Sequence, residues 1–527
     1  MRSNKIWRIG CLSVILFVCQ FCQSPAPDLG KGTVVPFLSV SATKSLLNSW
    51  GNDGIRLATV LEHYAQSSDS LKLKAACFLL KNVGDHYFVD VPHVYDSLLV
   101  RQSQSPLSGD LLNKALDSIS KEHRNTLLSY IPDYKVVTAE MLIENIDYAF
   151  LAWQLPWARK LSFDDFCTYI LPYKVGVEKP VRWRKKCYDQ LQHIIDSLPA
   201  NASRQSACTA INNELVWFKF QWPFRYPTVM DFDQLEAVKM GNCEDATTLT
   251  LYAMRAAGIP ATFDFTTQWA NRNYGHSWNT VLYENGNFIS FQGTESNPGE
   301  SKIEYDPEED WTFSRAKIFR RTFAKSGSNA ALFETSRDQI PSVFHDEFYI
   351  DVTASIIPTS NIDIPLLHSG WTTDPEIGYL CVFNNENWVP VSWGFVNRGV
   401  ASFKNVGQNS LYIVACYNNG HLEYASLPFS IDANGELQSY KAGLPGADTL
   451  LLQRKYPYNN SNLVKEHDLY QLQYWDNGWQ TLDTVMARSN YVAFSHLPVK
   501  ALYIMHDLTR GKQERPFSIE QKEQRFW

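Results

Sequence analysis

The sequence contains no run of basic residues, and its charges are nearly balanced. There are 48 Lys and Arg residues against 55 Asp and Glu residues, which gives a formal net charge of −7 at pH 7. A nucleic-acid-binding surface needs clustered Lys and Arg to meet the phosphate backbone. We therefore expect no nucleic-acid partner.

Glycine and proline are also not in excess, with 26 and 25 residues in a chain of 527. Together with 45% hydrophobic and 20% charged residues, this composition excludes a collagen-like or low-complexity chain and indicates a globular protein. The length is too great for one ordinary core, so several domains are expected. Aromatic residues make up 13% of the chain, which favours aromatic-rich β modules or a binding cleft.

No Cys-x-x-Cys spacing occurs after residue 23, which argues against a zinc site. An odd number of thiols leaves at least one of them free within a monomer, even in an oxidising compartment. We expect neither a metal nor another cofactor. The seven cysteines in this part of the chain are Cys77, Cys167, Cys187, Cys208, Cys243, Cys381 and Cys416.

The first 23 residues have the pattern of an export signal. Three basic residues in MRSNKIWR precede the apolar run IGCLSVILFVCQF, which is short for a membrane span. The segment also resembles a bacterial lipoprotein signal with lipidation at Cys22, because the polar linker QSPAPDLG follows that cysteine; Cys19 and simple secretion are the alternatives. We expect an exported protein, periplasmic or at the outer membrane or cell surface, with membrane contact only through such an anchor.

Residues 24–160 are predicted to form a helical N-terminal region. In TAEMLIENIDYAFLAWQ the apolar residues recur at three- and four-residue spacing, and Thr138 fits the N-cap of that helix. The segment DLLNKALDSISKEHRNTLLSYI has a similar pattern. A bundle packed ahead of a central domain is the simplest interpretation.

The C-terminal part contains an internal repeat with an offset of 91 residues. YLCVFNNENW at 379–388 aligns with YQLQYWDNGW at 470–479, and LYI at 411–413 aligns with LYI at 502–504. Alternating strand patterns with Asn- and Gly-containing turns predict two antiparallel β-sandwich modules, residues 345–435 and 436–527. They would serve as spacers, or would bind a cell-surface glycan or protein if their aromatic residues are exposed.

The stretch GNCEDATTLTLYAMRAAGIP predicts a helix that begins at Cys243. Asn242 fits the N-cap, Glu244 and Asp245 occupy the first turn, and Gly258 fits the C′ position. The helix N-terminus favours a thiolate, whereas the two acidic residues oppose it. Cysteine at a helix start is more often structural than catalytic, so a partner is needed to decide.

Such a partner follows in YGHSWNTVLYENGNFISFQGTE, which predicts a β-hairpin with His276 at its open end. A lone histidine on a strand is usually structural. A histidine that meets a helix-start cysteine forms instead a Cys–His pair.

The segments GNCEDAT, RAAGIPAT and GHSW resemble the transglutaminase-like superfamily of papain-like thiol enzymes. The resemblance covers about residues 160–310 and places an α+β core at 161–344, which gives a multidomain α+β protein with the flanking regions above. It implies a nucleophile at Cys243, a general base at His276 and no metal in the bacterial members.

The chain departs from the family at a third position. The family usually has an aspartate on the strand after the hairpin turn, whereas this chain reads FISFQGTES at 288–296. A two-residue Asn-Gly loop would place Glu295 opposite His276. A three-residue Glu-Asn-Gly loop would pair residues 278 and 292 and place Gln292 on the histidine's face. We favour Gln292, because the three-residue loop reproduces the diagonal arrangement of the family that the segments resemble. Gln292 is a neutral amide, but it can still orient the imidazole.

Three functions are consistent with these residues. The first is a thiol enzyme in which Cys243, His276 and Gln292 perform acyl transfer or hydrolysis at amide bonds of a protein or peptide. The second is a non-catalytic surface scaffold, supported by the missing aspartate. The third makes the β repeats the functional part, binding glycans at the cell surface.

Overall fold

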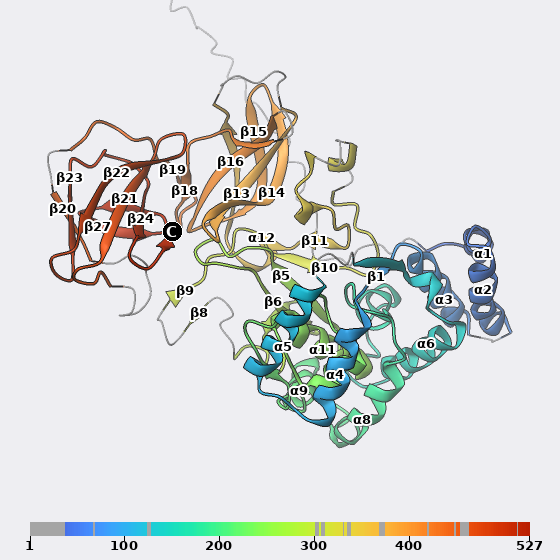
Figure 1. The fold of residues 1–527 in the computed structure, drawn as a ribbon. Helices are drawn as coiled ribbons and strands as arrows, with labels where there is room; N and C mark the ends of the chain where they lie inside the picture. Colours follow the sequence, from blue (N-terminus) through green and yellow to red (C-terminus); the bar gives the residue numbers. More distant parts are fainter. Residues whose placement is uncertain are drawn as a thin grey trace, which may run out of the picture.

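A computed structural model describes residues 37–66, 69–123, 128–300, 305–306, 311–329, 331–334, 339–367, 375–418, 421–446, 449–453, 463–513 and 515–527. Its N-terminal half is mainly helical and its C-terminal half is built of antiparallel strands (Figure 1). The expected signal, residues 1–23 with Cys22, lies outside these residues. Within the described part of the chain, no helix is long and apolar enough to cross a membrane.

The N-terminal region is helical, as predicted. Thr138 caps the helix that follows it by accepting a hydrogen bond from the N–H of Met141 at 3.2 Å. A two-stranded sheet of β1, Tyr87–Asp90, and β2, Ser129–Pro132, interrupts the helices. The helices are α1 Val40–Asn48, α2 Asn52–Ala65, α3 Ser70–Val83, α4 His93–Gln104, α5 Gly109–Glu122 and α6 Ala139–Trp153, with a 3-10 turn, η1, at Asp133–Lys135.

The central region combines helices with a five-stranded antiparallel sheet in the order β11-β10-β5-β6-β7. One hydrophobic core runs without a break from the N-terminal helices to this sheet, so the two regions pack as one body. The helical elements are α7 Phe163–Asp165, the π turn η2 Phe166–Ile170, α8 Arg184–Ser197, α9 Arg204–Asn213, α10 Phe232–Val238, α11 Cys243–Ala256, and the short turns η3 Leu332–Glu334, η5 Ser342–Phe344 and α12 Thr353–Ile356. The strands are β3 Lys219–Phe220, β4 Met240–Gly241, β5 Ala261–Thr266, β6 His276–Leu282, β7 Phe288–Phe291, β8 Tyr305–Asp306, β9 Trp311–Thr312, β10 Phe319–Arg321 and β11 Tyr349–Asp351. Strand β11 pairs in this sheet although it follows residue 344, the predicted end of the core.

Helix α11 begins and ends at the predicted positions. Asn242 and Asp245 form a capping box in which each side chain accepts a hydrogen bond from the other residue's backbone N–H. At the other end Gly258 has φ +67°, and a Cβ there would lie 2.4 Å from the carbonyl oxygen of Ala152. Only glycine fits this site, which fixes where the chain turns from α11 into β5.

The first C-terminal module is built of antiparallel strands around a common core, as predicted. Its eight strands form a continuous hydrogen-bonded path, β12-β15-β14-β13-β16-β18-β19, with β17 beside β16. The sheet curves because residues of β12 and β16, such as Ile362 and Tyr412, meet in a common core. The strands are β12 Thr359–Pro365, β13 Ile377–Asn384, β14 Asn387–Asn397, β15 Val400–Gly407, β16 Ser410–Asn418, β17 His421–Tyr424, β18 Phe429–Ile431 and β19 Leu437–Ser439.

The second module repeats the central part of the first. Strand β21 lies between β22 and β24, and β24 pairs with β26, just as β13 lies between β14 and β16 and β16 pairs with β18. A separate pair, β20 with β23, shares the core of this sheet, so the second module is a two-sheet sandwich. Its strands are β20 Thr449–Leu452, β21 Leu469–Trp475, β22 Trp479–Met486, β23 Val492–Ser495, β24 Tyr503–Asp507, β25 Lys512–Gln513, β26 Phe517–Glu520 and β27 Glu523–Phe526.

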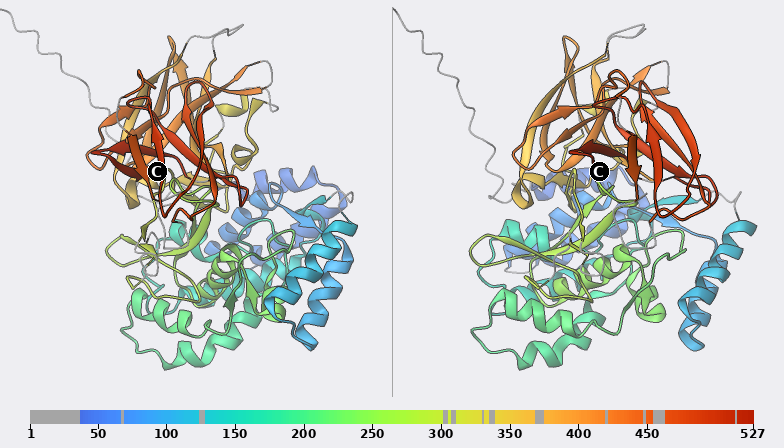
Figure 2. Two further views of the ribbon diagram at one scale, coloured as in Figure 1. Left: turned by 60° about the vertical axis from the view of Figure 1, so that its left-hand side comes forward. Right: turned by 90° about the vertical axis from the view of Figure 1, so that its left-hand side faces the viewer.

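The aromatic residues that the two copies share are mostly interior. Tyr379 and Tyr470 are 1% and 0% exposed, Trp388 is 6% exposed, and Trp479 packs against the same cluster between the modules. Tyr379, Trp388 and Trp479 belong to the core between the copies, whereas Tyr470 belongs to the core of the second module, and none of the four presents an exposed platform for a sugar ring. Figure 2 shows the two modules as one lobe beside the helical part of the molecule.

Candidate active site

The cavity of interest lies where the start of α11 meets the start of β6. It has a volume of about 490 Å³, and both Cys243 and His276 line it. Its walls are largely aromatic, with Arg272 and Glu295 as charged groups. The aromatic lining residues are Phe220, Trp222, Trp269, Tyr274 and Phe313.

Strand β6 and helix α11 are tied together directly below this cavity. The side-chain amide of Asn279 on β6 donates to the carbonyl oxygen of Thr247 on α11 at 3.1 Å and to that of Thr262 on β5 at 3.3 Å. The hydroxyl of Thr247 in turn donates to the carbonyl oxygen of Cys243 at 2.7 Å. These bonds fix the Cys243 end of the helix against the strand that carries His276.

The hairpin has the three-residue loop. The N–H of Tyr283 donates to the carbonyl oxygen of Asn287 at 2.8 Å, and Asn279 pairs with Phe291. Extended by one residue, that register aligns Trp278 with Gln292. The structure therefore brings Gln292, and not Glu295, onto the face of His276.

Gln292 contacts His276 directly, with 3.0 Å between His276 Nε2 and Gln292 Oε1. An amide oxygen can only accept a hydrogen bond, so the imidazole donates from Nε2. The neutral ring then carries its proton on Nε2, and Nδ1 has the free lone pair. Gln292 is 6% exposed, so this bond is shielded from water.

Two tryptophan rings pack near the imidazole. The ring of Trp269 lies 5.7 Å from that of His276 at an interplanar angle of 23°, and the ring of Trp278 lies 6.1 Å away at 28°. Burial among these rings lowers the pKa of His276 to about 4; the Gln292 hydrogen bond opposes the shift and the nearby Arg272 guanidinium adds to it. His276 is therefore a neutral base at pH 7.

Cys243 is the first residue of α11 and is partly exposed, whereas the other six cysteines in the described residues are buried. Burial raises the pKa of its thiol above the ordinary value. Hydrogen bonds from the side chain and backbone of Ser277 lower it again, and Glu244 and Asp245 raise it. The thiol of Cys243 and the imidazole of His276, which line the same cavity, are thus both neutral at pH 7.

The sheet behind the site contains a buried ion pair. Arg320 on β10 donates to both carboxylate oxygens of Asp264 on β5 at 2.8 Å, and Asp264 is 0% exposed. The guanidinium also lies 3.8 Å from the ring centroid of Phe288 on β7. Arg320 thus contacts β5 through the ion pair and β7 through Phe288, the two neighbours of β6, and so stabilises the strand that carries His276.

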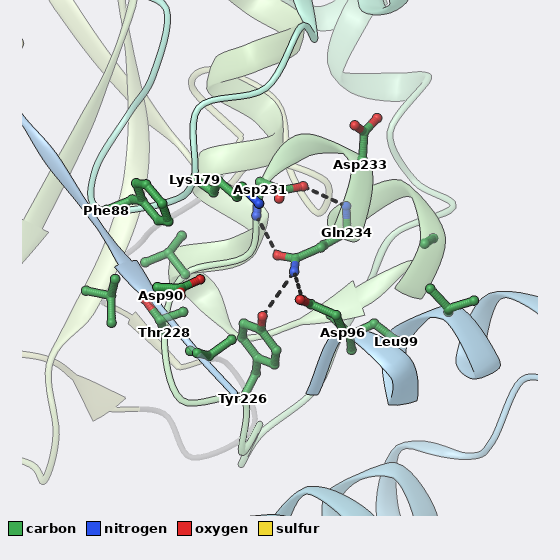
Figure 3. A pocket seen from close by; sticks show the side chains of 15 residues that line it. Phe88, Asp90, Asp96, Leu99, Lys179, Tyr226, Thr228, Asp231, Asp233 and Gln234 are labelled. Atoms are coloured by element: carbon green, nitrogen blue, oxygen red, sulfur yellow. Dashed lines mark hydrogen bonds between the residues drawn. The ribbon is translucent and has the colours of Figure 1, made fainter. Parts of the chain in front are cut away.

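A second cavity, of about 290 Å³, lies between β1, α4 and α10 (Figure 3). Neither cysteine nor histidine lines it, and its central polar groups bond one another. Gln234 donates to Asp96 at 2.9 Å and to Tyr226 at 3.0 Å, and Asp231 caps α10 by accepting from the N–H of Gln234 at 3.0 Å. These four polar residues therefore have structural roles.

Two aromatic residues that precede the cysteine in the sequence, Phe220 and Trp222, line the cavity. Strand β3 pairs with β4, and the N–H of Gln221 donates to the carbonyl oxygen of Gly241 at 2.8 Å, which places the chain beside Cys243. The Gln221 side chain points to Gly109 instead, and Trp217 packs against Phe218. Neither lines the cavity that Cys243 and His276 share.

Sequence reasoning missed the residues that surround the pair. Ser277 follows His276 directly, and Trp269 and Arg272 lie in the loop before it. Nothing in the sequence marks these three residues as part of the site, because their positions depend on how the loop at 267–275 folds over the cavity. Trp269 stands out only as an aromatic residue shortly before the histidine.

A profile of the Transglutaminase-like superfamily matches residues 194–292, from the end of α8 to Gln292. The chain contains a transglutaminase-like domain. Among curated proteins, none matches the sequence.

Two solved structures are similar to parts of the chain around the transglutaminase-like domain. One is a candidate cysteine protease from Cytophaga hutchinsonii, with 18% identity, a TM-score of 0.18 and coverage of 22% of this chain and 38% of that protein. The other is red sea bream transglutaminase, with 9% identity, a TM-score of 0.20 and coverage of 84% of this chain and 76% of that one. This chain thus spans well under half of the length of the protease.

Proposed function

We propose that the transglutaminase-like domain is a thiol enzyme that acts on amide bonds of a protein or peptide. Cys243 attacks the carbonyl carbon, His276 accepts the thiol proton, and Gln292 holds the imidazole. The observation that carries this proposal is the bond between His276 Nε2 and Gln292 Oε1, at 3.0 Å. It leaves Nδ1 as the base in a ring that lines the same cavity as Cys243.

The proton transfer in this proposal accompanies the attack. A raised pKa of Cys243 and a lowered pKa of His276 both favour the neutral pair over a preformed ion pair. As the sulfur bonds to the carbonyl carbon, the proton moves to Nδ1, and the tetrahedral intermediate forms. The backbone N–H of Cys243, at the start of α11, is a candidate donor to the oxyanion.

The same imidazolium then returns the proton to the leaving amine, and a thioester remains on Cys243. Water or a second amine resolves this thioester, which gives hydrolysis or acyl transfer respectively. Both routes regenerate the thiol, since His276 takes a proton from the incoming nucleophile and gives it to the sulfur.

A protein or peptide fits the aromatic cavity better than a small polar amide does. Trp222 and Tyr274 are 51% and 53% exposed at its edge, and their rings contact edge to face at 5.2 Å. Exposed aromatic residues of this kind bind extended apolar substrate segments at little entropic cost. Export, with lipidation at Cys22, remains part of this proposal.

The experiment uses the full chain with casein and with glutamine-containing peptides as substrates. Released ammonia and new amino termini are measured with and without an added alkylamine, for wild type and Cys243→Ala. Amine incorporation would identify acyl transfer, and product formation without amine would identify hydrolysis. No turnover by wild type above Cys243→Ala with any substrate would contradict the proposal.

The alternative is a non-catalytic binding scaffold. It is favoured by one observation, namely that a neutral amide rather than a carboxylate faces His276. The scaffold would bind peptides in the aromatic cavity with equal affinity in wild type and Cys243→Ala, and without covalent product. A thioester adduct on Cys243, found by mass spectrometry after acid quenching, would exclude it.

A further inference from the structure

The loop at 267–275 joins β5 to β6 and forms one side of the active-site cavity. It supplies Trp269, Arg272, Asn273 and Tyr274 to the lining, and it ends immediately before His276. Tyr274 has φ +67°, a left-handed conformation that is unfavourable for a tyrosine. A backbone of this kind persists only where neighbouring groups hold it.

The N–H of Trp269 donates to the carbonyl oxygen of Tyr274 at 2.9 Å, and the side chain that holds the loop from outside is that of Asn384, the last residue of β13 in the first C-terminal module. Its Oδ1 accepts from the N–H of Tyr274 at 2.8 Å. Its Nδ2 donates to three carbonyl oxygens of the same loop, those of Arg272 at 2.8 Å, Trp269 at 3.0 Å and Tyr274 at 3.1 Å. Asn384 is 0% exposed, so water does not compete for these bonds.

The internal repeat shows that the hairpin itself does not require this asparagine. With the offset of 91, Asn384 corresponds to Trp475, which is likewise the last residue of its strand, β21. Trp475 is buried and packs against Trp388 at 5.8 Å and Trp479 at 5.1 Å. The same strand end therefore packs between modules in one copy and binds the active-site loop in the other.

Two further contacts reinforce the attachment. The N–H of Asn385 donates to Oδ1 of Asn273 at 2.9 Å. Arg515, from the second module and 1% exposed, donates to the carbonyl oxygen of Ala270 at 2.8 Å and also to that of Phe383. Both C-terminal modules thus reach this loop.

We propose that Asn384 is a positioning residue of the active site, and that the first β module is a structural part of that site. Asn384 fixes the backbone of Trp269, whose ring packs against His276 at 5.7 Å. Through this contact it sets the orientation of the general base and the shape of the cavity wall. The catalytic part of this inference rests on the proposed thiol activity, whereas the structural part does not.

The test compares Asn384→Ala with Asn384→Asp and with a matched control, Asn387→Ala. Asn387 is exposed in the same turn, and its side chain donates to the carbonyl oxygen of Asn385 at 3.1 Å. Asn384→Asp keeps the acceptor for Tyr274 but removes the donor to the three carbonyls. Thermal unfolding confirms that each variant is folded, and Asn384→Asp serves as the test if Asn384→Ala is not.

The first readout is amide hydrogen exchange of the peptide that covers 267–275. Asn384→Ala should raise the exchange rate of this peptide by about 10-fold or more, because the Asn384 bonds are lost. Asn384→Asp should raise the rate to a smaller extent, and Asn387→Ala should leave it unchanged. Unchanged exchange in the folded Asn384 variants would overturn the structural part. This readout is independent of any catalytic activity.

The second readout is turnover. A displaced base lowers kcat by roughly 10- to 100-fold, because small errors in alignment at the reacting atoms are costly. The KM should change less, and Asn387→Ala should match wild type. Faster exchange of the loop with unchanged kcat would overturn the positioning role, whereas an inactive wild type would count against the proposed thiol activity alone.

Discussion

Gln292 Oε1 accepts a hydrogen bond from His276 Nε2 at 3.0 Å, in the place where members of this superfamily usually have an aspartate. The amide orients the ring as a carboxylate would, but it does not stabilise an imidazolium by charge. The pKa of His276, lowered to about 4, agrees with a base that is neutral until the attack.

Replacing Gln292 by glutamate should shift the acid limb of the pH–rate profile to higher pH. A carboxylate beside Nε2 stabilises the imidazolium, so it raises the pKa of His276 from about 4. Gln292→Ala should instead lower kcat/KM on the order of 10- to 100-fold, less than the 10²–10⁴ that a general base supplies. The profiles of kcat/KM between pH 3.5 and 9, measured for both variants, test these shifts.

Glu295→Gln is the matched comparison for Gln292→Glu. Glu295 is exposed at the cavity edge, and the register of the hairpin places it away from the face of His276. The acid limb should therefore stay where it is in wild type, although KM can change with the charge at the edge. If the acid limb of the pH–rate profile moved in Glu295→Gln and not in the Gln292 variants, Glu295 rather than Gln292 would be the partner of His276.

The activity of wild type should fall as the pH drops through about 4. Below the pKa of about 4 His276 is protonated and cannot accept the thiol proton; above it the ring is neutral, so the rate should be nearly constant up to neutral pH. His276→Ala should have a kcat/KM lower by a factor of about 10²–10⁴, and its pH–rate profile should lack the acid limb near pH 4. Stopped assays of a few seconds separate this effect from acid unfolding.

Arg320→Ala should destabilise the domain more than it disturbs the chemistry. It leaves the 0% exposed Asp264 carboxylate without its bidentate partner. Breaking a buried pair in this way costs about 3–5 kcal/mol of the free energy of unfolding. Urea denaturation of wild type, Arg320→Ala and the double variant Arg320→Met with Asp264→Leu measures it, and the double variant should recover much of the loss.

The elements that carry the site could be predicted because their signals are local. The N-cap at Asn242 and the glycine at 258 define α11, and the Asn285–Gly286 turn with its strands defines the hairpin. The choice between Gln292 and Glu295 could be reduced to the length of the loop, but the resemblance to the family was needed to favour the three-residue loop. The repeat with offset 91 predicted that the C-terminal strands form two related modules, and their strand order confirms this.

What the sequence could not predict depends on long-range packing. Asn384 lies over a hundred residues from Tyr274, and its side chain looks like any turn asparagine until the fold brings the two together. The continuous path of the strands in the first module likewise depends on which strands share a core rather than on any one strand. The lowered pKa of His276 likewise depends on rings that reach it from a neighbouring loop.

The central claim is that His276 activates the thiol of Cys243, and the pH dependence of Cys243 alkylation tests it most directly. Iodoacetamide labelling is followed by peptide mapping in wild type and His276→Ala; the other six cysteines of the described residues are buried and serve as internal references. The account predicts that wild-type Cys243 reacts at a nearly constant rate from about pH 5 to 8, at least ~10-fold faster than in His276→Ala. In His276→Ala the rate should follow the thiolate fraction, with a pKa above the ordinary ~8.5 of a free cysteine. Identical alkylation rates in wild type and His276→Ala, both rising about tenfold per pH unit, would contradict a role of His276 in activating the thiol.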